Sequence, residues 1–459
     1  MYKEIAKLIV YGSLPEDEIL VRLGGIFRDF EEGTKDPAAL TSEIYAQVKR
    51  ILQVGTDYGF DKSLWQDYLT FLLITNENPF TITSENKKAP ADASVNSFVK
   101  NDFAVFMNLF HFDFGPIEKA LSINCFSVLT DYTAIGKPEL MYNKNVSEKV
   151  RSLSDKLAAA EDVDTFFDLV TGFYDSYGVG MFGLNKAFRI NVSSLSAPDA
   201  WPGSAGSSLG GSFGGDDTGR DKIRFCPINN MDSVSLEDLV GYEIQKKKLI
   251  DNTEAFVNGR PANNVLLFGD SGTGKSTSVK AIVNRYYDRG LRMIEIYKHQ
   301  FKDLSGVIAA IKNRNYRFII YMDDLSFEDN ETEYKFLKAV IEGGVETKPE
   351  NILIYATSNR RHLINETWKD RADVTMSEGI HKSDTMEEKL SLVHRFGLTI
   401  GYTKPNQKEY FHIVEELAAR AGITMPKEEL FAEANKWELM YGGISGRTAQ
   451  QFVNHLLQG

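Results

Sequence analysis

The most informative stretch of this chain is Val265-Leu-Leu-Phe-Gly-Asp-Ser-Gly-Thr-Gly-Lys-Ser-Thr277. An apolar strand runs here into Gly-x-x-x-x-Gly-Lys-Ser, which is the pattern of a phosphate-binding loop. Gly269, Gly272 and Gly274 permit backbone conformations that a Cβ atom would forbid. The freed N–H groups can then point at phosphate oxygens, helped by the N-terminus of the helix that follows. The stretch therefore predicts a nucleotide-binding site.

Each residue of this loop is a candidate ligand of the nucleotide. Lys275 would reach the β- and γ-phosphates, and the hydroxyl of Ser276 would ligate Mg²⁺. The predicted contacts comprise the whole loop: Gly269, Asp270, Ser271, Gly272, Thr273, Gly274, Lys275, Ser276 and Thr277.

Strands and helices alternate on both sides of the loop. Short apolar runs predict strands at Asn264–Phe268, Leu291–Tyr297, Phe318–Met322, Ile352–Ala356 and Leu398–Tyr402. Helical patterns separate them, at Thr277–Arg285, Leu304–Lys312, Tyr334–Glu342 and Met386–Phe396. This alternation indicates a parallel sheet covered on both faces. Beyond Tyr402 only helical patterns remain, at Asn406–Ala421, Pro426–Met440 and Gly446–Leu457. We therefore expect an α/β domain followed by a small helical one.

Two carboxylates follow the buried strand Phe318–Met322. Ligands gather at the carboxyl edge of such sheets, so Asp323 and Asp324 are predicted to face the phosphate loop. Asp323 would hold the water shell of Mg²⁺, and Asp324 would polarise the attacking water. The alternative is a solvated strand end without a catalytic role.

An amide follows the next buried strand, Ile352–Ala356. Asn359 could orient the attacking water near the γ-phosphate, although an isolated asparagine after a strand is usually a turn residue. Arg360 and Arg361 come directly after it. They would face the nucleotide or a partner, or they are simply solvated charges.

Residues up to about 190 show mostly helical periodicity. Apolar positions recur at helical spacing in Leu20–Phe30, Ile44–Val54, Leu64–Ile74 and Val150–Phe173. Asp36-Pro37 and Gly55 punctuate the second of these runs as helix boundaries. A dense group of aromatics is predicted to be core: Phe103, Phe106, Phe110, Phe112 and Phe114. No catalytic constellation stands out in this region.

The run Ala197–Asp217 is rich in Gly, Ser and Pro and predicts a flexible linker. A glycine-rich functional loop is less favoured, because no strand is predicted before it. The expected organisation is a helical domain at 1–195, a linker at 196–222, an α/β core at 223–403 and a helical lid at 404–459.

Composition narrows the class of protein. The 459 residues are 42% hydrophobic and 25% charged, with a net charge of −12, which disfavours broad electrostatic binding to nucleic acid but leaves room for a local basic patch. Cys125 and Cys226 have no metal spacing and are expected to be buried thiols. No apolar run approaches membrane-spanning length and the N-terminus lacks a signal-peptide pattern. A cytoplasmic protein without a membrane partner is expected.

The order of phosphate loop, paired acids, polar sensor and helical lid resembles the AAA+ ATPases, from roughly Met231 to Gly459. The resemblance implies a five-stranded parallel core of order 5-1-4-3-2 that binds ATP and Mg²⁺. Leu239-Val-Gly-Tyr-Glu-Ile-Gln245 is similar to the segment that contacts the adenine, with Val240 and Gly241 nearest the base.

Two arginines acquire expected roles through the same resemblance. Ser445-Gly-Arg-Thr448 matches the second sensor, so Arg447 would reach the phosphates from the lid. His394-Arg-Phe-Gly397 matches the arginine-finger position, so Arg395 would serve a neighbouring subunit in a homo-oligomer. The alternative for either arginine is an ordinary surface ion pair.

Longer strings resemble one bacterial family of stand-alone AAA+ proteins, catalogued as domain of unknown function 815. They are Asp323–Glu328, Leu337–Gly344, Tyr355–Leu363 and Ser445–Thr448, and Tyr174–Arg189 resembles the end of the helical region that precedes the ATPase in that family. The family brings no known substrate.

One departure from the AAA+ pattern concerns the acid pair, which is usually Asp-Glu and here is Asp-Asp. Asp324 is one methylene shorter than Glu, and a misplacement of about 1 Å can cost about 10²-fold in rate. Hydrolysis could be slow, relayed by water or dependent on Glu328, whereas nucleotide binding would survive.

Several functions remain open at this point. The first is an oligomeric ATPase that remodels a macromolecule, with an unidentified protein partner. The second is a nucleotide-gated binding protein with slow or partner-triggered hydrolysis. The third is DNA-linked work of the helicase-loader kind, supported only by analogy. A small-molecule kinase would not need the sensor arginines, and the guanine-reading motif Asn-Lys-x-Asp is absent.

Overall fold

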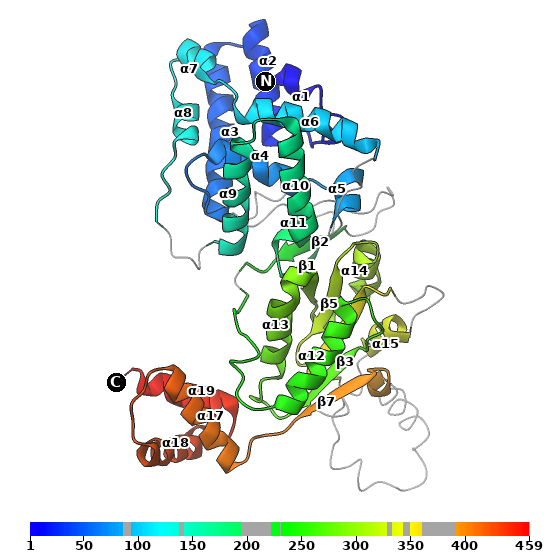
Figure 1. Ribbon diagram of the computed structural model, residues 1–459, viewed down its shortest axis with the longest axis vertical. Coiled ribbons are helices and arrows are strands. Elements are labelled where there is room, and N and C mark those ends of the chain that lie inside the picture. The colour runs from blue at the N-terminus through cyan, green and yellow to red at the C-terminus, as the bar shows by residue number, and fades with distance from the viewer. Residues whose placement is uncertain are drawn as a thin grey trace. The chain divides into compact units, whose positions relative to one another are not determined.

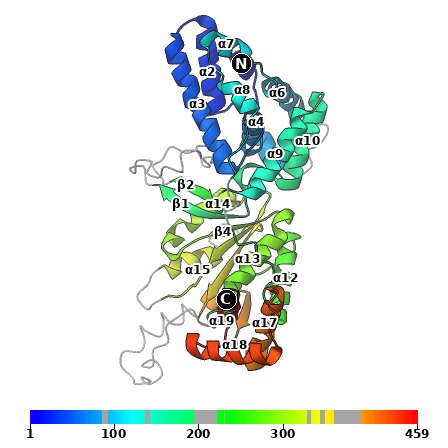
Figure 2. The same cartoon turned by 90° about the vertical axis from the view of Figure 1, so that its left-hand side faces the viewer.

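The computed structural model describes residues 1–85, 93–136, 142–193, 222–229, 231–327, 333–342, 349–359 and 392–458. The chain forms two compact units (Figures 1 and 2). The helical unit comprises Met1–Asn185 with Asn191–Asn230, and the sheet unit comprises Lys186–Ile190 with Met231–Gly459. Among the described residues, no helix is both long enough and apolar enough to cross a bilayer.

The helical unit contains short and long helices around one core. Their bounds are α1 (Tyr2–Ile5), α2 (Ile19–Glu32), α3 (Pro37–Tyr58), α4 (Leu64–Thr75), α5 (Pro79–Ser84), α6 (Val95–Phe110), α7 (Gly115–Leu121), α8 (Cys125–Thr130), α9 (Lys144–Ala158), α10 (Val163–Tyr177) and α11 (Gly180–Leu184). The aromatic group predicted as core is confirmed: Phe103, Phe106, Phe110 and Phe114 are buried, and Phe112 packs against them.

Helix boundaries in this unit follow local chemistry. Asp36 caps α3 by accepting hydrogen bonds from the N–H groups of Ala38 and Ala39, with Pro37 in the first turn. The predicted end at Gly55 is wrong, because α3 continues to Tyr58 and ends at Gly59, where φ is 66°. The single helical run predicted over Val150–Phe173 is also wrong, because it is divided between α9 and α10, with Asp162 capping the second.

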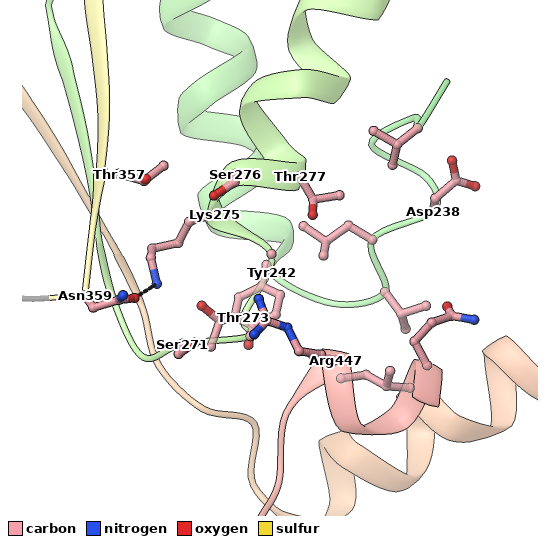
Figure 3. A pocket seen from close by; sticks show the side chains of 18 of the residues that line it. Asp238, Tyr242, Ser271, Thr273, Lys275, Ser276, Thr277, Thr357, Asn359 and Arg447 are labelled. Carbon is pink, nitrogen blue, oxygen red and sulfur yellow. Dashed lines mark hydrogen bonds between the residues drawn. The ribbon is translucent and has the colours of Figure 1, made fainter. Parts of the chain in front are cut away.

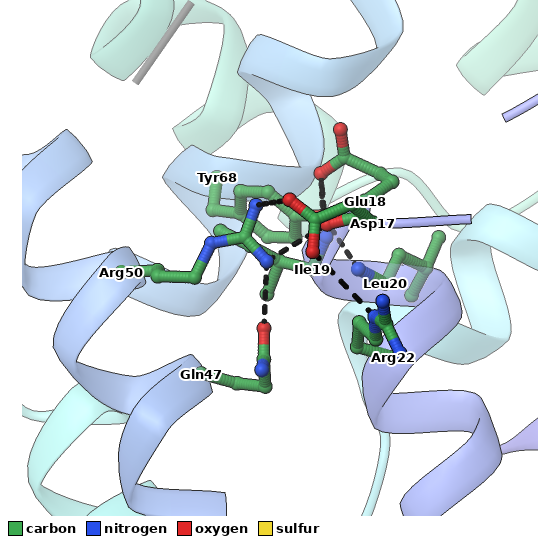
Figure 4. Close-up of polar contacts among 8 residues, drawn as sticks. All are labelled: Asp17, Glu18, Ile19, Leu20, Arg22, Gln47, Arg50 and Tyr68. Atoms are coloured by element: carbon green, nitrogen blue, oxygen red, sulfur yellow. Dashed lines mark hydrogen bonds and ion pairs between the residues drawn. The ribbon is translucent and has the colours of Figure 1, made fainter. Parts of the chain in front are cut away.

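The start of α2 is held by polar contacts from two other helices (Figure 4). Glu18 accepts from the hydroxyl of Tyr68 on α4 at 2.7 Å, and the same hydroxyl oxygen accepts from the N–H of Leu20 at 2.9 Å. Arg50 on α3 donates to the carbonyl oxygen of Asp17 at 2.7 Å. The bond from Leu20 satisfies one of the N–H groups that a helix start leaves without an intrahelical partner.

The sheet has seven strands in the order β2-β1-β4-β5-β6-β3-β7. The strands are β1 (Ala187–Ser193), β2 (Lys222–Pro227), β3 (Val265–Gly269), β4 (Leu291–Glu295), β5 (Arg317–Met322), β6 (Ile352–Ser358) and β7 (Leu398–Tyr402). From β4 to β7 every neighbouring pair is parallel, and β1 pairs with β4 in the same sense. Counted from the phosphate-loop strand, β3 to β7 lie in the order 5-1-4-3-2.

Two strands were not predicted, so the expectation of five strands is wrong. β1 and β2 extend the sheet beyond β4. β1 lies at the end of the region that is expected to be mostly helical, and it contradicts the premise that no strand precedes the glycine-rich run. The predicted linker itself, apart from Lys222, lies outside the described residues.

Helices flank the sheet on both sides (Figure 2). The pair α12 (Glu243–Val257) and α13 (Lys275–Tyr286) lies on one side, and α14 (Leu304–Ile311) and α15 (Tyr334–Glu342) lie on the other. Short 3₁₀ turns occupy Tyr287–Arg289 and Lys298–Asp303. Burial on both faces explains why β6 is buried along its whole length.

Three helices follow β7: α17 (Gln407–Arg420), α18 (Lys427–Tyr441) and α19 (Gly446–Leu456). They share a small core that includes Tyr410, Val414, Ala434 and Phe452. Asn406 and Glu409 form a capping box at the start of α17. This helical group is the part of the sheet unit that faces the phosphate loop.

Candidate functional site

The phosphate loop joins β3 to α13, and the backbone conformation and close contacts of its glycines exclude other residues. Gly269 has φ of 131°, and a Cβ atom there would lie 1.9 Å from the carbonyl oxygen of Tyr402 on β7. Gly272 and Gly274 have φ of 76° and 89°, in the left-handed region that favours glycine. The close approach of β7 adds a packing constraint that the motif alone did not indicate.

A cavity of about 650 Å³ opens at this loop (Figure 3). Its wall comes from the segment before α12, the phosphate loop, the ends of β5 and β6, and the helices α17 and α19. Most of the predicted site residues line it: Val240, Ser271, Gly272, Thr273, Gly274, Lys275, Ser276, Thr277, Asp323, Asp324, Asn359 and Arg447. The structure thus brings together residues that are far apart in the sequence.

Four predicted residues do not line this cavity. Gly241 lines a neighbouring hollow with Lys246, and Gly269 is covered by β7. Asp270 points toward the segment that follows β7, where its carboxylate accepts from the N–H of Lys404 at 2.9 Å. Arg395 is half-buried just before β7 and away from the cavity wall.

Lys275 is held at the floor of the cavity by three acceptors. Its Nζ donates to the carbonyl oxygens of Gly269 and Asp270 at 2.8 and 2.6 Å, and to Oδ1 of Asn359 at 3.1 Å (Figure 3). Burial lowers the pKa of this ammonium from its usual value, while the carboxylates of Asp270, Asp324 and Asp323 act in the opposite direction. The amine is therefore fixed beside the loop by three oxygen acceptors.

Asp323 is the acceptor of three hydroxyl groups. Its Oδ1 accepts from Ser276 at 2.8 Å, Tyr321 at 2.7 Å and Thr357 at 2.5 Å. Partial burial raises the pKa of this carboxyl, but the hydrogen bonds outweigh it and hold the pKa below the ordinary value. Asp323 thus stays ionised.

The pair of Ser276 and Asp323 fits a magnesium ion. A hydroxyl and an ionised carboxylate lie within hydrogen-bond distance beside a phosphate loop, and Mg²⁺ is typically held by one or two such oxygens together with phosphates and water. The described residues contain no cluster of three or more His, Cys, Asp or Glu side chains suited to a metal. An all-protein metal cage is not needed for this kind of ion.

Asp324 has an unusual backbone conformation with φ of 50°. Asp tolerates this left-handed region better than most residues with a side chain. Its N–H donates to Oγ1 of Thr357 at 2.9 Å, and its Oδ1 accepts from Nδ2 of Asn359 at 2.8 Å. Asn359 therefore bridges Lys275 and Asp324 through the two ends of its amide.

The C-terminal helical group reaches the phosphate loop through the start of α19. Ser445 caps this helix by accepting from the N–H of Thr448 at 3.1 Å. The N–H of Arg447 donates to the carbonyl oxygen of Gly272 at 3.3 Å, and its exposed side chain extends toward Ser271 and Thr273 (Figure 3). A guanidinium here can meet negative charge bound at the loop.

Sequence reasoning missed several residues of the site. Tyr321 and Thr357 are buried strand residues whose hydroxyls reach Asp323. Tyr242 has φ of 62° and donates from its hydroxyl to the carbonyl oxygen of Thr403. The remaining cavity residues are Val234, Asp238, Leu239, Ile413, Leu417, Gly446 and Gln450. Position at the carboxyl end of a predicted strand was the available signal for Thr357.

Some expectations lie on residues outside those the structure describes. These are Glu328, Arg360, Arg361 and most of the helix predicted over Met386–Phe396. The expectation of buried cysteines is wrong, because Cys125 is half-buried and Cys226 is exposed.

The fold and the cavity define this chain as an α/β phosphate-loop protein. It belongs to the family described as "Protein of unknown function (DUF815)", whose model matches residues 216–459. The comparison with curated proteins finds no match.

Among solved structures, the chain is similar to the RuvB Holliday junction branch migration motor of Thermotoga maritima. The identity is 17%, the TM-score is 0.34, and the match covers 49% of this chain and 64% of that one. Two mutants of the same RuvB match at 17% and 18% identity, with TM-scores of 0.35 and 0.34, over 49% of this chain and 64% and 65% of theirs. The chain thus spans less than two thirds of the RuvB chains that it matches.

Proposed function

We propose that this protein is an ATPase of the AAA+ kind that binds ATP with Mg²⁺ in the cavity at the phosphate loop and hydrolyses it there. The observation that carries the proposal is the convergence on one cavity of Lys275, the Ser276–Asp323 pair and the Asp324–Asn359 pair. Arg447 on the lid adds a second cation to the same wall. This set supplies the charge that a triphosphate needs and an acid for its hydrolysis.

Each side chain has a defined task in the proposed reaction. Lys275 and the loop N–H groups bind the β- and γ-phosphates, while Ser276 and Asp323 would hold the metal. Magnesium, when bound, would supply positive charge that offsets the negative charge of the phosphates. Asp324 accepts the proton of the attacking water, and Asn359 orients that water and Asp324 through its amide. Arg447 stabilises the negative charge of the transferred phosphoryl group.

The base would lie against the segment before α12. Leu239, Val240, Ile413 and Leu417 give this part of the cavity an apolar wall. Adenine specificity comes to this proposal from the AAA+ resemblance.

A Lys275→Ala variant tests the proposal. We expect at least about a hundredfold weaker ATP binding and loss of phosphate release, because the amine that neutralises the phosphates is gone. Equilibrium binding of ATP and steady-state phosphate release measure both. Lys280→Ala is the matched control, since Lys280 lies on the same helix and pairs with Asp232. A Lys275→Ala protein that hydrolyses ATP as fast as the unmodified one would refute the proposal.

The second candidate is a nucleotide-gated binding protein, favoured by the acid pair Asp323-Asp324, in which the shorter Asp324 stands where the AAA+ pattern has Glu. In this function ATP shifts the population of a partner-binding conformation, and turnover is slow or requires the partner. Tight ATP binding with negligible turnover at every protein concentration would favour this function over the first.

The remaining parts of the proposal concern assembly. We propose a homo-oligomer in which Arg395 completes the site of a neighbouring subunit, residues 404–459 act as the lid, and hydrolysis drives remodelling of a protein partner. DNA-linked work is less favoured because the net charge is −12.

A further inference from the structure

Tyr321 and Thr357 direct two buried hydroxyls at one carboxylate oxygen. Tyr321 is 0% exposed on β5 and Thr357 is 1% exposed on β6. Both donate to Oδ1 of Asp323, at 2.7 and 2.5 Å. Ser276 donates to the same oxygen, but it is itself a proposed metal ligand. Tyr321 and Thr357 are therefore the two hydroxyls dedicated to orienting this carboxylate.

We propose that Tyr321 and Thr357 are positioning residues of the magnesium site, and that Thr357 also sets the backbone of Asp324. The inference rests on the proposed function, which it deepens. Because all three hydroxyls meet at Oδ1, the other oxygen of Asp323, Oδ2, would be the one that contacts the water shell of the metal. A carboxylate held in this way is oriented before the ion arrives, which raises its affinity for the ion.

Thr357 connects both acids to β6. Its Oγ1 donates to Asp323 and accepts from the N–H of Asp324 at 2.9 Å, and its carbonyl oxygen accepts from the N–H of Leu325 at 2.7 Å. These contacts enclose the residue whose φ is 50°. A residue with a side chain keeps such a conformation only where its surroundings determine it. Thr357 thus couples the position of the Asp323 carboxylate, which would hold the metal, to that of the Asp324 carboxylate, the proposed proton acceptor.

The two residues differ in what their loss removes. Tyr321→Phe deletes one donor to Asp323 and leaves the Asp324 turn untouched. Thr357→Val keeps the shape of the side chain but deletes both the donor to Asp323 and the acceptor for Asp324. Thr357→Ser restores both hydrogen-bonding functions. Tyr355→Phe is the matched control, because Tyr355 is equally buried in the same sheet but its hydroxyl bonds Thr253 at 2.7 Å.

The experiment is a magnesium titration of ATP binding, with a fluorescent ATP analogue and the full chain. In excess EDTA all variants should bind the analogue as the unmodified protein does. With Mg²⁺, the half-saturating metal concentration should rise about tenfold or more in Tyr321→Phe and Thr357→Val, as for other residues that orient metal ligands. Thr357→Ser and Tyr355→Phe should remain within about twofold of the unmodified protein.

Turnover at saturating Mg²⁺ separates the two positions. Tyr321→Phe should recover the unmodified rate, whereas Thr357→Val should stay about tenfold slower because the Asp324 turn is loosened. Equal magnesium requirements in Tyr321→Phe, Thr357→Val and Tyr355→Phe would overturn the inference while leaving the proposed function intact. Failure of the unmodified protein to bind ATP would overturn the proposed function and the inference with it.

Discussion

Among single residues, Asp324 differs from the glutamate of the usual Asp-Glu pair, and its backbone conformation gives a reason for the difference. A φ of 50° suits Asp better than Glu, because a short polar side chain tolerates the left-handed region. The shorter acid is also within 2.8 Å of the Asn359 amide. The turn and the amide together place a carboxylate at the cavity although it lacks one methylene.

Asp324→Asn removes the proposed proton acceptor while keeping a residue that tolerates this backbone. We expect phosphate release to slow by about 10²-fold or more, which is the usual contribution of a general base. ATP affinity should change by less than about twofold, because Lys275 and the loop still bind the phosphates. Rapid-quench assays and equilibrium binding measure the two quantities.

Asp288→Asn is the control, since Asp288 is exposed on a 3₁₀ turn outside the cavity. Unchanged turnover in Asp324→Asn would show that another group activates the water.

The residues of the site were predictable to different degrees. Lys275, Ser276 and Asp323 follow from the loop motif and from the carboxyl end of an apolar strand. Tyr321 and Thr357 were not predicted, because Tyr and Thr are common in buried strands, so that even the position of Thr357 at the carboxyl end of a strand does not mark it as a site residue. The partner of a buried hydroxyl depends on which strands are neighbours, and that emerges only from the folded sheet.

At the scale of elements, continuous apolar runs were informative and short alternating ones were overlooked. β5 and β6 are buried on both faces and therefore form uninterrupted apolar stretches. β1 alternates, with Phe188 and Ile190 apolar and Arg189 exposed. That period of two indicates a strand, but helical periodicity upstream dominated the interpretation.

Packing of α4 against α9 creates a titratable group in the helical unit. Asp67 is 3% exposed, and its Oδ2 has no hydrogen-bond partner among the described residues. Burial raises the pKa of this carboxyl to about 7, against the opposing effects of Ser154 and Arg151. The folded protein thus keeps a proton that the unfolded chain has already lost between about pH 4 and pH 7.

Asp67→Asn should remove this contribution to pH dependence. In the unmodified protein, protonation of Asp67 makes the free energy of unfolding fall as pH rises from about 4 to 7. Above the pKa of Asp67 in the folded protein, this contribution no longer changes with pH. The variant should therefore gain relative stability as pH rises, by up to roughly 4 kcal/mol at neutral pH. Urea unfolding of the full chain, followed by circular dichroism between pH 5 and 8, measures the difference.

The exposed Asp168→Asn on α10 serves as the control for Asp67→Asn. A stability difference between Asp67→Asn and the unmodified protein that stays constant with pH would contradict the expectation.

At the scale of the whole molecule, the pattern of motifs predicted the α/β class but not the boundaries of the compact units. The glycine-rich composition of 196–222 suggested a division there, whereas Lys186–Ile190 already belongs to the sheet unit. Amino-acid composition indicates which segments have few apolar side chains to bury. It does not indicate which strand pairs with the edge of a sheet formed by residues far away in the sequence.

The proposed role of Arg395 can be tested through the assembly of the whole molecule. If Arg395 completes a neighbour's site, turnover per subunit should rise with protein concentration and then saturate. Arg395→Ala should lower the saturated rate by at least about tenfold and leave ATP affinity unchanged, because the loss concerns charge stabilisation during transfer. Phosphate release over a wide concentration range, alongside sedimentation, measures this.

Arg28→Ala, an exposed change in the helical unit, is the control for Arg395→Ala. Turnover per subunit that does not vary with concentration would contradict completion of the site by a neighbour.

The pairing of β1 with β4 restricts how this gene could have been assembled or could be recombined. Residues 216–459, the stretch that the family model matches, lack β1, which pairs Ala187–Arg189 with Met293–Glu295. A shuffling event at the glycine-rich stretch would carry away that strand and uncover a row of backbone groups on β4, of the kind that recruits foreign strands. The helical region and the nucleotide-binding region are therefore expected to be inherited together rather than recombined as separate domains.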